Sequence, residues 1–116
     1  MEKFREVVAY KNYFEDFLKS QPLRVQVKIY KIIEIIEYQQ FIPNQYLKHI
    51  EGTDGLYEAR ISLSRTIWRI FCFFDDGKLI ILLNGFQKKT QKTAHTEIDK
   101  ALKSRVEYYS DKKHNK

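Results

Sequence analysis

The spacing of hydrophobic residues up to position 40 predicts one short strand followed by two helices. Residues 4–8 partly alternate between apolar and polar side chains, which predicts the strand. Asn12 can cap a short helix, because the large apolar residues after it share one helical face: Tyr13, Phe14, Phe17 and Leu18. Residues 20–22 interrupt this helix, and Pro22 suits the first turn of a second helix over residues 23–40. The second helix has an apolar stripe made of Val25, Ile29, Ile32, Ile33 and Ile36.

Beyond residue 42 the pattern changes from a helical period to a period of two, which predicts strands. A loop comes first, and it contains Lys48, His49, Gly52 and Gly55. Residues 56–62 and 66–74 then predict two strands, and residues 79–83 predict a third that is apolar on both faces. Residues 75–78 predict a hairpin turn, because the Asp-Gly pair within them supplies the positive φ angles that tight turns need.

The last predicted element is a helix capped by Thr96, with Asp99 three residues later in the reciprocal capping position. Residues 111–116 are polar and are expected to fray. The order of strand, two helices, three strands and helix predicts an α+β fold with an antiparallel-rich sheet and helices packed on one side. Residues 1–116 fit a single domain of this kind.

Charge is distributed unevenly along the chain. Residues 1–86 carry 12 basic and 11 acidic side chains, whereas residues 87–116 carry 9 basic and 4 acidic ones. Such a concentration of cations favours a polyanionic partner, because neutralising phosphates releases condensed counterions. The alternative is a solvated, lysine-rich final helix that keeps the protein in solution.

Several classes of protein are disfavoured. The longest apolar runs are shorter than the roughly 18 residues of a membrane span, and residues 1–6 carry charges where a signal peptide is apolar. Cys72 is the single cysteine, so no disulfide framework is expected and a cytoplasmic location is favoured. Nucleotide-binding glycine loops, nucleophile elbows and metal-ligand spacings are not found in the sequence, so no cofactor, metal or membrane partner is expected.

The first candidate site is a pair of arginines on neighbouring predicted strands. Arg69 interrupts an apolar strand, and we expect it where that face opens to solvent, since an unpaired guanidinium is costly to bury. Arg60 shares a strand face with Glu58. Opposed guanidinium groups suit phosphate oxygens. The alternative is a pair of structural arginines bound to Glu58 and to backbone carbonyls.

The second candidate is the polar segment 87–93, which contains Lys88, Lys89 and Lys92 and joins the last strand to the last helix. Crowded lysines lower one another's pKa, which favours a general base. The alternative is a solvated basic loop. His49 and His95 lie in predicted loops and suit proton transfer near neutral pH, although plain surface histidines are the alternative.

Three segments together resemble the phage-derived HigB-like branch of the RelE/ParE toxin superfamily. They are Gly55-Leu56-Tyr57-Glu58-Ala59-Arg60, Trp68-Arg69-Ile70-Phe71 and the run from Leu82 to Thr93, followed by Glu97-Ile98 and a helix. The resemblance implies a RelE-like fold and a type II toxin that cleaves mRNA in the ribosomal A site without a metal or other cofactor. It also implies a helix-turn-helix antitoxin partner that is HigA-like.

The residues and the resemblance together predict a set of site residues. The expected catalytic residues are Arg60, Arg69, Lys88, Lys89 and His95. The expected RNA-binding residues are Lys48, His49, Arg65 and Lys92. Two other functions stay open: a gyrase inhibitor of the ParE kind, which has no chemistry of its own, and a basic RNA-binding module.

Overall fold

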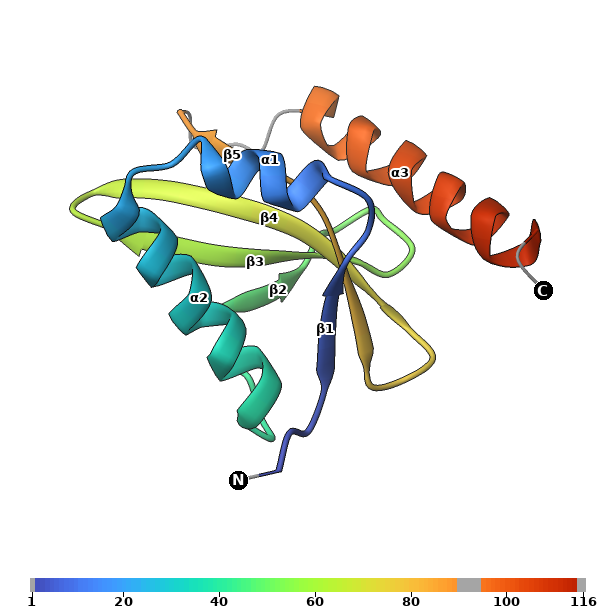
Figure 1. Cartoon of the computed structure of the whole chain (residues 1–116), viewed down its shortest axis with the longest axis horizontal. Coiled ribbons are helices and arrows are strands. Elements are labelled where there is room, and N and C mark those ends of the chain that lie inside the picture. Colours follow the sequence, from blue (N-terminus) through green and yellow to red (C-terminus); the bar gives the residue numbers. More distant parts are fainter. Residues whose placement is uncertain (1, 90–94, 115–116) are drawn as a thin grey trace.

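The computed structural model describes residues 2–89 and 95–114 and has the α+β organisation that the sequence predicts. The elements in chain order are β1 (Glu6–Ala9), α1 (Tyr13–Lys19), α2 (Leu23–Tyr38), β2 (Leu47–His49), β3 (Leu56–Leu63), β4 (Thr66–Asp75), β5 (Leu79–Lys88) and α3 (His95–His114) (Figure 1). The strands form one five-stranded sheet in the order β1-β5-β4-β3-β2. β1 runs parallel to β5 and the other neighbours are antiparallel.

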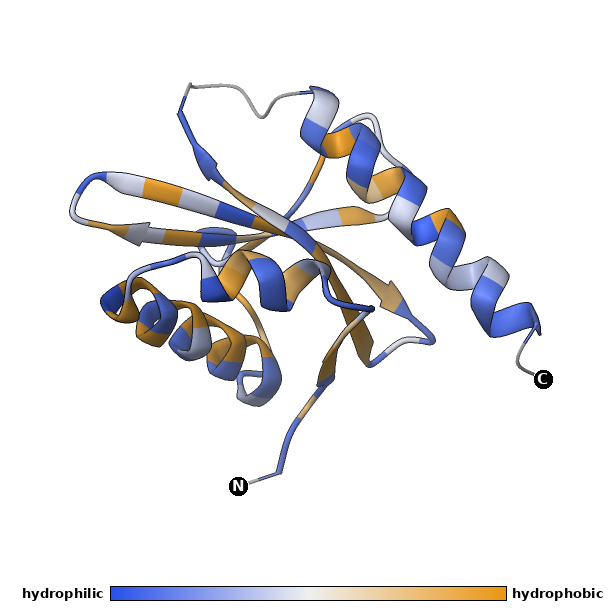
Figure 2. Ribbon diagram, turned by 45° about the horizontal axis from the view of Figure 1, so that its top comes forward, coloured by the Kyte–Doolittle hydropathy of each residue, from blue (hydrophilic) through white to orange (hydrophobic). Residues whose placement is uncertain are grey.

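The sheet is covered on both faces, which differs from the expectation that the helices pack on one side. Side chains of α1 and α2 pack with Ala59, Ile70 and Leu82 in one apolar core. Ala101 of α3 packs with Phe71 and other residues in a second core on the opposite face. The reason is that β4 and β5 are apolar at consecutive positions, so both of their faces must be covered. Figure 2 shows these hydrophobic strands beneath an α3 that is mostly hydrophilic.

Two strands differ from the prediction at their boundaries. Lys48 and His49, placed in a loop by the sequence pattern, belong to the edge strand β2, which is too short to show an alternating pattern. β5 continues to Lys88 instead of ending near residue 83. Its continuation contains an irregularity, because two residues, Leu83 and Asn84, lie opposite the single residue Phe71 of β4.

The helices differ less from their predicted bounds. α2 ends at Tyr38 because Gln39 is already extended, with φ −91° and ψ 130°. α3 begins at His95, so Thr96 lies in its first turn. Thr96 is therefore not the capping residue that the sequence predicts. Within the described residues, no helix is long and apolar enough to span a membrane.

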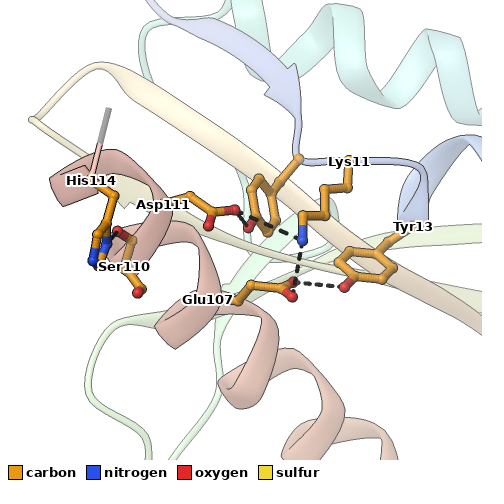
Figure 3. Close-up of polar contacts among 7 residues, drawn as sticks. Lys11, Tyr13, Glu107, Ser110, Asp111 and His114 are labelled. Carbon is orange, nitrogen blue, oxygen red and sulfur yellow. Dashed lines mark hydrogen bonds and ion pairs between the residues drawn. The ribbon is translucent and has the colours of Figure 1, made fainter. Parts of the chain in front are cut away.

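α3 is held to the rest of the chain by two polar anchors near its C-terminal end. In the first, Glu107 binds the Lys11 amine at 3.0 Å and accepts a hydrogen bond from the Tyr13 hydroxyl at 2.7 Å, and Asp111 accepts one from Tyr10 (Figure 3). These contacts carry the helix to His114, past the point at residue 111 where the sequence pattern predicts fraying.

The second anchor joins α3 to the end of β4. The Asp75 carboxylate accepts hydrogen bonds from the Tyr108 hydroxyl at 2.6 Å and from the Lys112 amine at 2.8 Å. The two anchors fix the C-terminal half of α3, and Ala101, Ile98 and Leu102 pack the other half on the second core.

Candidate nucleic-acid interface

Arg60 and Arg69 are directly opposed on β3 and β4 and share one carboxylate. Their Cα atoms are register partners in the antiparallel pair, so their side chains lie on the same face. The Nε atoms of Arg69 and Arg60 lie 3.1 Å and 3.4 Å from Oε2 of Glu58. Glu58 is buried. It lies two residues before Arg60 on β3, so the alternation of the strand places both side chains on the same face.

Backbone carbonyls hold the other ends of both guanidinium groups. Nη1 of Arg69 donates to the Trp68 carbonyl at 3.1 Å, and Nη1 of Arg60 donates to the Asn44 carbonyl at 3.3 Å. The interpretation of structural arginines bound to Glu58 and to carbonyls is therefore confirmed for the bonding of this pair.

The two arginines differ in their access to solvent. The Arg69 side chain is 4% exposed, whereas that of Arg60 is 28% exposed. The expectation that Arg69 lies where its face opens to solvent is therefore wrong. Arg69 is on the central strand β4, flanked by both neighbours, and its charge is matched by Glu58. Arg60 lies beyond the end of the short strand β2, at the margin of the sheet, so it is the arginine that a phosphate can reach.

Burial lowers the pKa of two groups in this cluster. Burial lowers the pKa of the Arg69 guanidinium, Glu58 opposes that change, and Arg60 adds to it. Burial also lowers the pKa of the Lys88 amine, and the charges of Arg69 and Arg60 lower it further against the opposing effect of Glu58. Lys88 is thus close enough to both arginines to respond to them, and its neutral form is favoured relative to that of an ordinary lysine.

Lys48 lies on the same sheet face as the two arginines. It is the register partner of Glu58 across β2 and β3, and both residues line a shallow cavity. The expected site residues on this face are Lys48, Arg60, Arg69 and Lys88, and Glu58, which pairs with both arginines, lies on the same face. We call these five residues the cationic face. Fixed cations around one point are suited to phosphate oxygens.

Other expected site residues lie away from the cationic face. His49 also lines the shallow cavity of Lys48 and Glu58, but its ring lies on the other side of β2, with its centroid 5.3 Å from that of Tyr57 and its Nε2 3.0 Å from the Thr53 carbonyl oxygen. The cause is alternation, since Lys48 and His49 are adjacent on one strand. Arg65 is exposed in the β3–β4 turn with φ 68°.

The remaining expected residues come from the segment after β5. Lys89 is exposed immediately beyond the strand, and His95 is exposed at the first residue of α3. Lys92 lies outside the described residues, as does most of the segment 87–93 to which it belongs. The part of this segment that joins the cationic face is therefore Lys88.

Sequence reasoning treated Glu58 as a mere partner and did not single out Lys28. The signal for Glu58 is its position two residues before Arg60 in an alternating strand. Lys28 of α2 carries no comparable signal, because it lines a cavity together with Arg60 only when α2 is packed beside β3. Over residues 2–89 and 95–114, histidine, cysteine and carboxylate side chains do not gather in groups of three that can hold a metal ion.

Comparisons with known proteins give one family match and a match to a solved structure. A family model described as "Phage derived protein Gp49-like (DUF891)" matches residues 16–106. Comparison with curated proteins gives no match. Among solved structures, the chain is similar to one in the crystal structure of the archaeal RelE-RelB complex from Pyrococcus horikoshii OT3, with 21% sequence identity and a TM-score of 0.53. The match covers 74% of this chain and 97% of the other, and it confirms the RelE-like fold that the sequence resemblance implies.

Proposed function

This chain belongs to the phage-derived Gp49-like family, and on that premise we propose that it is the toxin of a type II toxin–antitoxin pair that cleaves translated mRNA. The observation that carries the proposal is the cationic face, in which two opposed arginines and Lys88 gather around Glu58. Such a face suits a nucleic-acid backbone, because phosphate contacts supply a large share of the affinity of nucleic-acid binding. The resemblance to RelE-type toxins favours RNA as that nucleic acid.

The proposed reaction uses the RNA's own 2′-hydroxyl as the nucleophile. That oxygen loses its proton to a general base and attacks the adjacent phosphorus, while the bond to the 5′-oxygen of the next nucleotide breaks and that oxygen gains a proton. The products are a 2′,3′-cyclic phosphate and a 5′-hydroxyl end. A base, an acid and a cation that stabilises the crowded phosphorus centre are sufficient for this chemistry.

The described residues supply two of these roles. Arg60 is partly exposed on the cationic face and binds the scissile phosphate, because its guanidinium carries donors beyond those used by Glu58 and Asn44. Lys88, whose pKa burial and Arg69 lower, accepts the 2′-hydroxyl proton. His95 is the candidate for the acid, because Lys89 is solvated beyond the end of β5. Arg69 is buried and acts as a positioning residue that holds Glu58, and Lys48 binds a flanking phosphate.

The proposal also names where the protein acts and what restrains it. The substrate is mRNA in the ribosomal A site, which places the activity in the cytoplasm. The restraining partner is a helix-turn-helix antitoxin of the HigA-like kind. The solved structure that this chain resembles contains RelE together with RelB, so the fold is compatible with a bound partner protein.

Pulse labelling in cells that express the chain tests the proposal. We expect incorporation of labelled amino acids to stop before incorporation of labelled thymidine, and mapped mRNA ends to show new cuts within translated frames. Expression of Arg60→Ala is the matched control, and it should leave both kinds of incorporation unchanged.

The opposite order of events would contradict the proposal. If DNA synthesis stops first with a DNA-damage response and mRNA stays intact, the chain acts as a gyrase inhibitor of the ParE kind. If neither synthesis is affected while the protein accumulates, the chain is a basic RNA-binding module.

A further inference from the structure

A cavity of about 310 Å³ lies beside Arg60, outside the contacts that Arg60 makes with Glu58. Figure 1 shows α2 passing along the β2–β3 side of the sheet, where this cavity is found. Residues from three segments line it: Lys28, Ile32, Gln45, Tyr46, Arg60 and Ser62. Its volume lies at the lower end of the range of roughly 300–1,000 Å³ for small-molecule sites, which suits one nucleotide unit better than a larger ligand.

The charge of this cavity distinguishes it from its neighbours. Two of its lining residues, Lys28 and Arg60, are cationic and none is acidic. Four other cavities of the described structure each have a carboxylate in their lining, from Glu34, Asp54, Glu51 or Glu58. A phosphate group entering the cavity beside Arg60 therefore meets attraction without a repelling carboxylate in the lining.

The neutral lining residues fit a nucleobase. Ile32 is buried and forms an apolar part of the wall, and the half-buried Tyr46 supplies an aromatic ring. Unpaired bases of RNA stack on such rings. Gln45 and Ser62 are exposed at the rim and offer donors and acceptors to the edge of a base.

Arg60 connects this cavity to the cationic face. Its Nε lies 3.4 Å from Glu58 on that face, while its Nη1 donates to the carbonyl of Asn44, which directly precedes the lining residue Gln45. Ser62 is two residues further along β3 and therefore on the same strand face as Arg60. A strand of RNA whose phosphate is bound by Arg60 has its adjoining nucleotide within reach of the cavity.

We propose that this cavity binds the nucleotide that adjoins the scissile phosphate, with its base against Tyr46 and its phosphate between Lys28 and Arg60. The identity of the ligand as RNA rests on the proposed function. The cavity adds residues that select which base is bound. Gln45 and Ser62 are the residues that distinguish bases, because their side chains can hydrogen-bond to base edges.

Titration of the whole, isotope-labelled chain with each of the four ribonucleoside monophosphates tests the proposal by NMR. We expect the amide signals of residues 45–46 and 62 to shift, and one base to bind more tightly than the others. Lys28→Met should weaken binding about tenfold, which corresponds to the loss of one charge-assisted hydrogen bond. Lys31→Met is the matched control on the same helix, because Lys31 is exposed and lines a different cavity with Glu34, and it should leave the affinity unchanged.

Three results would overturn the proposal. They are unshifted signals at residues 45–46 and 62, equal shifts from inorganic phosphate alone, and equal weakening by Lys28→Met and Lys31→Met. The titration does not depend on cleavage. A chain that binds nucleotides in the cavity but cuts no mRNA would refute the proposed function alone, whereas a chain that cuts mRNA but shows no such binding would refute the cavity alone.

Discussion

Lys88 and its neighbour Lys89 differ sharply in their electrostatic surroundings. Lys88 is half-buried near Arg69, and burial together with that charge lowers the pKa of its amine. Lys89 is exposed just beyond the end of β5. An amine with a lowered pKa is unprotonated more often at neutral pH, so it accepts a proton more readily.

We expect Lys88→Met to reduce the rate constant of mRNA cleavage at saturating toxin by about 100-fold or more, the usual contribution of a general base. Lys89→Met should change it by less than about fivefold, because a solvated amine off the cationic face contributes little. In the wild type, the rate should rise with pH through the lowered pKa of Lys88, and Lys88→Met should lose this rise. Equal losses in the two variants would contradict the assignment.

The sequence pattern cannot distinguish these two lysines, and the cause is a single irregularity. Alternation continued from the buried residues Ile81 and Leu83 places Lys89 on the face of Arg69. The extra residue in β5 opposite Phe71 shifts the phase by one position, so that Phe86 is the register partner of Arg69 and Lys88 shares its face. The sequence pattern also cannot predict that Arg69 is buried. Its partner Glu58 lies on another strand and meets it only through the pairing of β3 with β4.

At the level of elements, the packing of α1 on β5 depends on a glycine. A Cβ atom added at Gly85 would lie 2.6 Å from the ring of Phe17, closer than any real contact of that kind. Gly85 has no need of a positive φ angle, so its role is close approach: it lets α1 lie on the sheet where β5 continues toward Lys88.

We expect Gly85→Ala to lower the free energy of unfolding by about 1–3 kcal/mol, the usual cost of overpacking a core. Phe17→Leu should cost stability by itself, yet it should reduce the additional loss caused by Gly85→Ala, because the colliding ring is gone. Urea denaturation of the two single variants and the double variant gives the coupling energy. Strict additivity would show that Phe17 is not the group that the new methyl meets.

The anchor between Asp75 and α3 makes stability depend on pH. Burial alone raises the pKa of Asp75, but hydrogen bonds from Lys112 and Tyr108 outweigh it and hold the pKa below its usual value. The resulting stabilisation is complete above the unfolded pKa of about 4 and is lost as the pH falls through the lower folded value.

We expect Asp75→Asn to lower the free energy of unfolding by about 2 kcal/mol at neutral pH, as for other hydrogen bonds to charged groups. The difference from the wild type should shrink as the pH falls below about 4. Asp76→Asn is the matched control, since Asp76 is exposed in the adjoining turn, and it should behave as the wild type does. A difference for Asp75→Asn that stays constant with pH would contradict the anchor.

Across the whole molecule, the long elements follow from the sequence and the short or irregular ones do not. The apolar stripe of α2 and the alternation of β3 are periodic, and β4 is a long apolar run. All three appear within two residues of their predicted bounds. The three-residue strand β2 has too few positions to show a period. The position of α3 on the second face depends on contacts with β5 and β4, which no local pattern contains.

The candidate site follows the same division. Arg60, Arg69 and Lys88 were identified by their residue type and by family resemblance, and the structure brings them together. The separation of His49 from them, and the cavity formed by Lys28, Tyr46 and Arg60, depend on which face each strand presents and on how α2 crosses the sheet. Those features arise only when the chain is folded.

Cleavage of mRNA on the ribosome is the activity that we propose for the cationic face, and a purified translation system tests it. Purified wild-type chain and purified Arg60→Ala, each shown to be folded by circular dichroism, are added to ribosomes translating a defined mRNA, and the RNA ends are mapped. The account predicts cuts within the translated frame that end in a 2′,3′-cyclic phosphate for the wild type, and intact mRNA for Arg60→Ala. Intact mRNA at saturating wild-type chain, or equal cutting by both, would contradict it.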